Sequence, residues 1–362
     1  MHRSMTLAAV FVLLCISCAT TLGQVNSENN ARLREALQAF PDADADGNGV
    51  LTLEEAKSYR QRLAAGRGQR PRPQKDRAQP SGRQADPARL AAIEKTGGGL
   101  WIGSTGHSLV GPAMTPLEAI AKAAGCDGHL QICQLSGGAS GSPRAHWEKP
   151  EAEQRMKAAL ATGKLDVLTM GIHTEGSEVE DIARWIELGL QHNADMVFYL
   201  QDAWPRLPAL LPPQGQQSAA PALDTYKDEM GRINAFVKER VDALDERFPA
   251  KVHVIPVGNA MLELVERYLA GKLPGVEAIF IDKKEGGERT SLYRDSIHPS
   301  SAVATLEGYI YFACLYKRNP AELAAGVYHD PKLDAILREV AWKAVSEHPL
   351  SGVTAEARPV RR

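Results

Sequence analysis

Short apolar segments alternate with amphipathic ones from about residue 90 to about residue 320, and this alternation constrains the fold more than any other feature. The apolar segments have the length of buried strands, whereas the segments between them show helical periodicity. The predicted strands are residues 99–104, 130–135, 165–170, 195–200 and 252–257. The predicted helices are residues 116–124, 151–162, 177–192, 223–248 and 261–270. Strands separated by helices pair in parallel, so the sequence predicts an α/β domain over residues 91–345 whose parallel sheet has helices on both faces.

The composition is that of a globular protein with one large domain and a small appendage. The chain has 362 residues, of which 44% are hydrophobic and 24% are charged, with a net charge of −2. This near-neutral charge gives no indication of a nucleic-acid partner or of an anionic membrane surface. Behind the N-terminal segment the chain carries three cysteines, Cys126, Cys133 and Cys314. A disulfide between Cys126 and Cys133 and a set of buried thiols are both compatible with this number.

The first 23 residues have the pattern of an export signal. A positive charge precedes an apolar run over residues 5–17, and small residues lead to a cleavage site before Gln24. The run is shorter than the roughly 20 residues that a membrane span requires, and no other segment has a transmembrane pattern. We therefore expect an exported protein, periplasmic or extracellular. Lipoprotein anchoring through Cys18 is the less favoured alternative, because Cys15 stands where such signals carry leucine.

Three further segments flank the predicted α/β domain. Residues 28–62 show a helix–loop–helix pattern. Residues 63–90 are rich in Arg, Gln, Pro and Gly and contain few large apolar residues, which predicts a disordered basic linker. This linker is either a solvated spacer or a contact for an acidic surface or polysaccharide. Residues 346–362 form a C-terminal tail.

The loop of the helix–loop–helix segment matches the EF-hand pattern for Ca²⁺ in one frame. The ligand positions of the pattern are filled by Asp44, Asp46, Asn48, the carbonyl of Val50, Thr52 and the bidentate Glu55. A glycine, Gly49, stands at the sixth position, where the loop must turn sharply. The sequence therefore predicts a structural Ca²⁺ site. The alternative is an acidic turn that caps a helix without a metal.

Three separated segments carry residues of the types that hydrolytic chemistry uses. Ser108 follows the first predicted strand in the segment Gly106-His-Ser-Leu, where a glycine allows a tight turn. The second strand is followed by a glycine-rich segment that ends in Ser140-Gly141, where backbone N–H groups can approach a substrate oxygen. Asp295 and His298 stand three residues apart near the end of the domain, a spacing that brings both side chains to one side of a turn.

In this order the three segments resemble the SGNH/GDSL hydrolase family over about residues 97–320. The resemblance implies a three-layer α/β/α flavodoxin-like sheet and the hydrolysis of acyl esters without a cofactor. It implies that Ser108 is the nucleophile, that His298 is the general base and that Asp295 orients His298. The N–H groups of Ser108 and Gly141 would form the oxyanion hole, with Gly138 as the reserve donor.

One segment departs from the family pattern. After the third strand the family carries Gly-x-Asn, whose asparagine amide is an oxyanion donor, but here His173 occupies that place. A histidine N–H can also donate a hydrogen bond, so His173 is a candidate donor, and lining of the cleft is the other interpretation. Gln201 is an alternative amide donor or a substrate contact. His107 and Trp204 are candidate substrate-binding residues, Trp204 as a surface for a sugar ring. The alternatives are structural packing for His107 and an ordinary surface aromatic for Trp204.

These residues favour an exported serine esterase with a Ca²⁺-binding appendage. The resemblance and the export signal together imply O-acetyl groups on carbohydrates as a substrate class. The main alternative is a non-catalytic SGNH-like binding protein of the cell envelope that recruits a partner in a calcium-dependent way; the altered third segment favours it. Cleavage of phospholipids or thioesters is a third hypothesis and would require a more apolar cleft.

Overall fold

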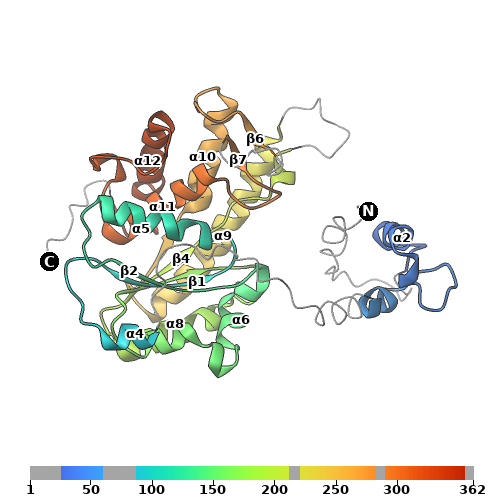
Figure 1. The fold of residues 1–362 in the computed structure, drawn as a ribbon, viewed down its shortest axis with the longest axis horizontal. Helices are drawn as coiled ribbons and strands as arrows, with labels where there is room; N and C mark the ends of the chain where they lie inside the picture. The colour runs from blue at the N-terminus through green and yellow to red at the C-terminus, as the bar shows by residue number, and fades with distance from the viewer. Residues whose placement is uncertain (1–25, 60–86, 212–220, 282–289, 355–362) are drawn as a thin grey trace. The chain divides into compact units, whose positions relative to one another are not determined.

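Five parallel strands form the central sheet, in the order β2-β1-β3-β4-β5. Figure 1 shows this sheet between helices. The computed structural model describes residues 26–59, 87–211, 221–281 and 290–354. The strands are β1 (Trp101–Gly106), β2 (Leu130–Leu135), β3 (Val167–Gly171), β4 (Val197–Gln201) and β5 (Val252–Ile255). This strand order is that of flavodoxin-like folds, in which ligands bind beyond the carboxyl ends of the strands. The predicted fold class is therefore confirmed.

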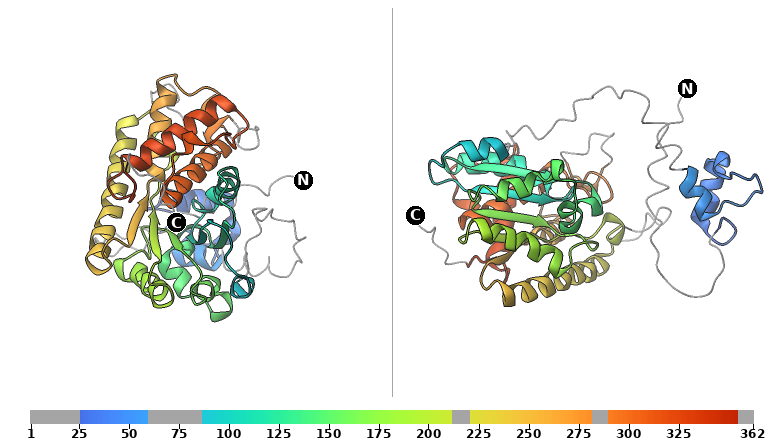
Figure 2. Two further views of the ribbon diagram at one scale, coloured as in Figure 1. Left: turned by 90° about the vertical axis from the view of Figure 1, so that its left-hand side faces the viewer. Right: turned by 90° about the horizontal axis from the view of Figure 1, so that it is seen from below.

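Helices cover both faces of the sheet, which gives three layers (Figures 1 and 2). One face is covered by α5 (Gly111–Ala123), α10 (Val257–Leu269), α11 (Ser301–Tyr316) and α12 (Pro331–Ser346). The other is covered by α4 (Pro87–Ala92), α6 (Pro143–Trp147), α7 (Arg155–Leu160) and α8 (Val179–His192), while the long α9 (Leu223–Arg247) contributes to both layers. Successive strand residues point to opposite faces. Thus Trp101 and Ile102 lie in different hydrophobic clusters, and both are buried.

Several elements differ from the sequence predictions. Helix α5 begins at Gly111 rather than at residue 116, because Pro112 occupies the first turn and Pro116 is accommodated inside the helix. The short α6, the strands β6 (Ala278–Phe280) and β7 (Ser291–Tyr293) and the helix α12 were not predicted. The start of α12 nevertheless carries a helix-capping signal in the sequence. Asp330 precedes the helix, and its carboxylate accepts from the N–H groups of Lys332 and Leu333 in the first turn.

The boundaries of the α/β domain extend beyond the predicted ones at both ends. Helix α4 begins at Pro87, inside the segment predicted to be linker, and Leu90 is fully buried. At the other end, the carbonyl of Leu350 accepts from the N–H of Val254, so the first residues of the predicted tail pack on β5. The predicted signal segment 1–23, residues 60–86 and residues 355–362 lie outside the described residues.

The chain divides into two units, Met1–Ala78 and Gln79–Arg362. In the smaller unit, α2 (Ala31–Ala39) and helical residues 53–59 flank the predicted calcium loop. Leu33, Ala36, Leu51 and Ala56 are among the residues that form its own small core. An antiparallel bridge connects Asn26, the first described residue, to Thr52 in the second half of the loop.

The three cysteines of the described part are buried free thiols. Burial raises the pKa of Cys133 and of Cys314 to about 12, so both remain protonated at neutral pH. Of the two alternatives for Cys126 and Cys133, the structure shows the thiols. Among the described residues, no helix has the length and apolar character needed to cross a membrane.

Candidate active site

Ser108, His298 and Asp295 form a continuous hydrogen-bonded chain. Nε2 of His298 lies 2.8 Å from Oγ of Ser108, and Nδ1 of His298 lies 2.7 Å from Oδ2 of Asp295. With Nδ1–H donating to the carboxylate, Nε2 is left to accept the serine proton. The structure thus brings together the three residues predicted as nucleophile, base and orienting acid.

The loop between β7 and α11 presents the acid and the base. Oδ1 of Asp295 accepts from the N–H groups of Ile297 and His298, at 3.0 and 2.8 Å. The N–H of Arg294 donates to the carbonyl of His298 and closes the loop, and Oγ of Ser300 caps α11 directly behind it. This local turn explains why two residues three apart face the same side.

The hydrogen bonds of Asp295 also keep its carboxylate ionised. Partial burial raises its pKa, but the N–H groups of His298 and Ile297 and the imidazole of His298 outweigh this effect. The net pKa lies below the ordinary value of 3.8. A negative charge therefore faces Nδ1 of His298 throughout the neutral range, as the predicted role of Asp295 in orienting this ring requires.

Trp204 anchors this loop and does not line a sugar-binding surface, so that prediction is wrong. Its side chain is 2% exposed, and its Nε1–H donates to the carbonyl of Ile297 at 2.9 Å. The N–H of Leu207 donates to the carbonyl of Ser296 at 2.8 Å. The segment after β4 therefore positions the loop that carries Asp295 and His298.

Ser108, the predicted nucleophile, stands between β1 and α5, where the chain turns tightly. A Cβ on Gly106 would lie 2.5 Å from Cγ2 of Val110 and 3.0 Å from the backbone nitrogen of Gly171, so glycine allows the close packing at the end of β1. Ser108 precedes the first turn of the 13-residue α5, whose N-terminal end favours negative charge. In the described part of the chain, no atom accepts a hydrogen bond from the backbone N–H of Ser108. That N–H is free to meet a substrate oxyanion.

Gly141 packs directly against residues 107–110, which connect β1 to α5 and carry Ser108; we call them the nucleophile loop after the predicted role of Ser108. A Cβ at this position would lie 2.5 Å from the carbonyl oxygen of Gly106 and 2.6 Å from Cα of His107. Gly141 ends the 3₁₀ turn η2 (Gly138–Gly141) and is buried, whereas Gly138 is exposed with nothing within 4 Å of its Cβ position. This packing favours Gly141 over Gly138 as the glycine donor.

His173 follows β3, and its backbone contacts determine its tautomer. The N–H of Glu175 donates to Nδ1 of His173 at 3.1 Å. In the neutral ring the proton must therefore reside on Nε2, which becomes a donor. The ring lies edge-on to that of His107, with the centroids 6.0 Å apart. This tautomer is the one that the predicted oxyanion role requires.

His107 is a structural link, so its prediction as a substrate contact is wrong. The residue is 5% exposed; its Nε2 lies 2.9 Å from the carbonyl oxygen of Ile172, and its Nδ1 accepts weakly from the N–H of Leu109. Burial lowers its pKa, and the nearby His173 and His298 lower it further. The neutral imidazole joins the nucleophile loop to the segment that carries His173.

Gln201 is also unavailable to a substrate, which corrects both of its predicted roles. The side chain is fully buried. Its amide Nε2–H donates to the carbonyl of Leu109 at 3.0 Å, and its Oε1 accepts from the hydroxyl of Tyr311. Gln201 therefore stabilises the nucleophile loop through Leu109 and has no free amide N–H directed at a substrate.

A second polar relay near the strand ends was missed by the sequence reasoning. Nδ1 of the buried His146 is hydrogen-bonded to the hydroxyl of Thr105, and its Nε2 lies 3.0 Å from Oγ of Ser136. Burial lowers the pKa of His146 to about 4. His146 shows no ligand or catalytic spacing along the chain, so only the fold reveals this contact.

The predicted calcium loop brings its carboxylates together in the smaller unit. Ligand oxygens of Asp44, Asp46 and Glu55 lie within 4.8 Å of one another. Gly49 has φ +80°, as the sharp turn of such a loop requires. The hydroxyl of Thr52 donates to Glu55 at 2.7 Å, and this bond is the main cause of the lowered pKa of Glu55.

The other predicted ligands of this loop lie close by in sequence and contact each other. Oδ1 of Asn48 accepts from the N–H of Val50 at 2.7 Å, and the amide of Asn48 donates to Asp46. The donor set is composed of oxygens, which fits a hard cation such as Ca²⁺.

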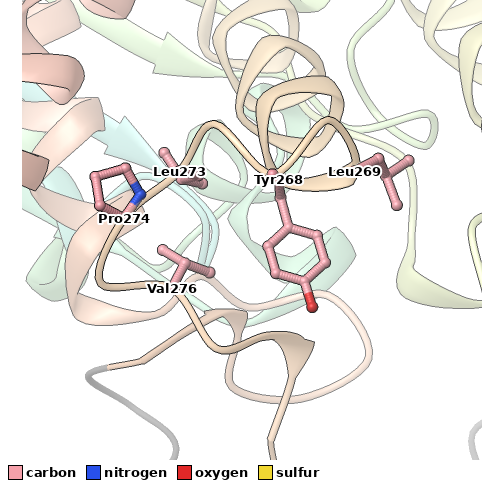
Figure 3. Close-up of a pocket in the computed structure, with 6 residues that line it drawn as sticks. Tyr268, Leu269, Leu273, Pro274 and Val276 are labelled. Atoms are coloured by element: carbon pink, nitrogen blue, oxygen red, sulfur yellow. The ribbon is translucent and has the colours of Figure 1, made fainter.

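A separate surface hollow lies at the end of α10 (Figure 3). Its lining residues are Tyr268, Leu269, Gly271, Leu273, Pro274 and Val276. None of these is an acid, a histidine, a serine or a cysteine, and the Tyr268 hydroxyl donates to the carbonyl of Glu277. This hollow therefore lacks the groups for hydrolytic chemistry.

No protein-family model and no curated protein matches the chain. Among solved structures, it is similar to a DUF4886 family protein from Bacteroides uniformis ATCC 8492, with 14% identity, 68% of this chain and 94% of that chain covered, and a TM-score of 0.49. It is similar to a GDSL-like lipase from Parabacteroides merdae ATCC 43184, with 11% identity, coverages of 61% and 96%, and a TM-score of 0.36. A third similar structure is the periplasmic domain of the lipopolysaccharide acetyltransferase of Salmonella ser. Paratyphi A, with 10% identity, coverages of 48% and 72%, and a TM-score of 0.32. At these identities, function has to be inferred from the geometry of the site.

Proposed function

We propose that the chain is a serine ester hydrolase in which Ser108 is the nucleophile. The observation that carries this proposal is the chain of hydrogen bonds from Ser108 through His298 to Asp295, at 2.8 and 2.7 Å. His298 Nε2 takes the proton of Ser108 as the hydroxyl attacks the ester carbonyl, and Asp295 stabilises the imidazolium that results. The imidazolium then protonates the leaving alcohol, and water releases the acyl group by the same steps.

The oxyanion of the tetrahedral intermediate would be held by three donors. They are the N–H groups of Ser108 and Gly141 and the Nε2–H of His173. The free N–H of Ser108, the packing of Gly141 against Gly106 and the Nε2–H tautomer of His173 support this assignment. The N-terminal end of α5 adds a favourable field at the same place.

Acetylated carbohydrates are the substrate class that we propose, with export as the setting. This proposal rests on the predicted signal segment and on the sequence resemblance. The assembled acid–base pair favours it over a non-catalytic binding protein, since a binding domain does not require a serine within hydrogen-bonding distance of an oriented imidazole.

The experiment is an esterase assay with p-nitrophenyl acetate and longer-chain esters. We expect the native chain to hydrolyse the acetate and Ser108→Ala to reduce the rate to the level of the uncatalysed reaction. Ser140→Ala is the matched control, because its hydroxyl is exposed and only donates to the carbonyl of Gly137. Equal rates for the native chain and Ser108→Ala would contradict the proposal. Acetate release from acetylated xylan would then test the substrate class.

We also propose that the loop from Asp44 to Glu55 binds Ca²⁺. The convergence of three carboxylates within 4.8 Å supports this proposal. Calorimetric titration with Ca²⁺ should give a saturable signal that Glu55→Gln removes. The control is Glu54→Gln, because Glu54 is exposed and pairs with Lys57. Absence of heat in the native chain would contradict the site.

A further inference from the structure

A second hollow lies at the amino ends of the strands, at the opposite edge of the sheet from Ser108. It has a volume of about 480 Å³. Its lining includes Leu100, which precedes β1, and Val167 and Val197, the first residues of β3 and β4. Ser108 follows the last residue of β1, so the two places lie at the two ends of the same strands. The hollow is therefore distinct from the proposed catalytic site.

Lys317 brings a positive charge to this hollow. Its Nζ donates to the hydroxyl of Tyr199 at 2.7 Å and lies 5.2 Å from the centre of the Tyr199 ring. Within the described ranges, no carboxylate oxygen lies within 4.0 Å of this ammonium group. Burial lowers the pKa of Lys317, as expected for a cation that lacks a counter-ion. A bound anion would supply that counter-ion.

The backbone of Lys317 has a conformation that usually belongs to glycine. The residue ends α11 in the left-handed region, with φ 53° and ψ 37°. Glycine or asparagine ordinarily stands at such a helix end, because a side chain there costs about 1 kcal/mol. The left-handed backbone would thus favour glycine or asparagine at position 317, but the chain carries a lysine whose side chain lines the hollow.

The remaining walls are aromatic and apolar. The His253 ring is tilted against the Tyr199 ring, with the centroids 5.4 Å apart, and burial lowers the pKa of His253 to about 4, so it is neutral. Neither of its ring nitrogens has a hydrogen-bond partner in the described part of the chain. Tyr316 and Leu100 add further ring and aliphatic surface. The walls thus offer a cation, a neutral imidazole and a surface for an apolar body.

The acidic residues of the lining do not neutralise Lys317. Asp166 is engaged by Lys95, 2.5 Å away, and by the N–H of Trp101 at 2.7 Å. Asp195 is exposed. Since the described residues of the lining carry two carboxylates beside one free cation, a ligand with one negative charge meets less repulsion there than a phosphate with two.

We propose that this hollow binds a small organic monocarboxylate with an apolar body. Its carboxylate pairs with Nζ of Lys317 and accepts from it, and its body lies against Tyr316 and Leu100, which are half-buried lining residues. A volume of about 480 Å³ accommodates a ring-sized ligand. The proposal does not depend on the esterase activity, since none of the residues of the hollow belongs to the triad.

The test uses sodium benzoate as the probe and the full chain. Histidine ring signals are followed by NMR, and the His253 signal is assigned with His253→Gln. We expect benzoate to shift the His253 signal with a Kd on the order of 1 mM, as for a fragment-sized ligand. Lys317→Met should weaken this binding at least about tenfold, the loss expected for a charge-assisted contact. Neutral benzamide should bind the native chain more weakly than benzoate does.

Two controls make the outcome decisive. Lys332→Met removes an exposed lysine on α12 and should leave benzoate binding unchanged. Lys317→Gly should lose binding while retaining or raising the melting temperature, because glycine relieves the left-handed backbone. The proposal would be overturned if Lys317→Met bound benzoate as the native chain does, if benzoate shifted only the His298 signal, or if about 20 mM benzoate shifted no histidine signal.

Discussion

Asp295 uses its two oxygens for two different tasks. Oδ1 accepts from two backbone N–H groups and shapes the loop, while Oδ2 faces Nδ1 of His298 at 2.7 Å. A single residue therefore determines both where the base stands and which of its nitrogens carries the proton. A substitution should therefore be able to remove the contact with His298 and still preserve the shape of the loop.

Asp295→Asn separates these tasks. The asparagine Oδ1 can still accept from the backbone, but its NH₂ group cannot accept from Nδ1–H of His298. We expect an intact fold and a decrease in kcat of at least about 10²-fold, since the carboxylate is partly exposed and other serine hydrolases lose up to about 10⁴-fold. The measurement is kcat for p-nitrophenyl acetate together with the melting temperature. An unchanged kcat would show that the carboxylate does not orient the base.

His173 permits a test of the third oxyanion donor. His173→Ala removes the Nε2–H and should reduce kcat by about 10²- to 10³-fold with a small change in KM. His173→Asn introduces the donor that the family pattern carries and should retain most of kcat. If the alanine variant kept the native kcat, His173 would have no part in holding the oxyanion.

At the residue scale, the proximity of Ser108, His298 and Asp295 could be predicted because three separated motifs stand in the order of a known family. The predictions for Gln201, Trp204 and His107 were wrong for a common reason. Polar and aromatic residues just beyond strand ends can face the cleft or the interior, and only the packing of distant segments decides between the two. Gln201 is held in the interior by a hydrogen bond from the hydroxyl of Tyr311 on α11, which lies 110 positions away in the sequence.

At the element scale, the nucleophile loop and the 3₁₀ turn η2 touch without side chains between them. Gly141 faces backbone atoms of Gly106 and His107, which cannot move aside as a flexible side chain could. The separation of these two elements therefore sets the geometry of the two backbone donors.

Gly141→Ala should disturb this geometry. Its Cβ would lie 2.5 Å from the carbonyl oxygen of Gly106, so the turn must shift. We expect a decrease in kcat of at least about tenfold and a loss of about 1–3 kcal/mol in the free energy of unfolding, as for overpacking. Gly137→Ala is the control, because φ is −93° there and nothing lies within 4 Å of its Cβ position. Equal kcat values for the two variants would refute the contact.

Element prediction succeeded where the pattern was long and failed where it was short. The five strands of the sheet were located within a few residues, because each is an apolar segment bounded by turn residues. The strands β6 and β7 have three residues each, too few for any periodicity to be visible. Helix α5 was placed late because a proline inside a helix resembles a proline at its start.

At the scale of the whole molecule, the domain buries two carboxyl groups that lack ionic partners. Asp202 follows β4 and Glu307 lies on α11, and both are almost fully buried. Burial raises the pKa of Asp202 to about 8 and that of Glu307 well above its ordinary value; the proximity of Asp202 raises the latter further. In the described part of the chain, Oδ2 of Asp202 and both oxygens of Glu307 lack hydrogen-bond partners.

The contribution of Asp202 to the stability of the native chain should therefore decrease as the pH rises. The folded pKa of Asp202 is about 8, against an ordinary value of 3.8. The contribution of its neutral form is complete below about pH 4 and is lost as the pH rises through 8, with a slope of at most about 1.4 kcal/mol per pH unit. Asp202→Asn should match the native chain at about pH 4.5 and exceed its melting temperature at about pH 8. Asp195→Asn, at an exposed position, is the control, and a native advantage at pH 8 would refute the prediction.

The serine and its base lie 190 positions apart in the sequence, and this separation has a consequence for biosynthesis. A nascent chain that has emerged as far as β5 already contains the nucleophile and both backbone donors but still lacks His298. In the proposed mechanism, the hydroxyl of Ser108 therefore remains unactivated until almost the entire domain has been synthesised and α11 has docked on the sheet. Ester turnover, once demonstrated, would thus report that the domain has completed its folding, since an unfinished chain lacks the proposed base.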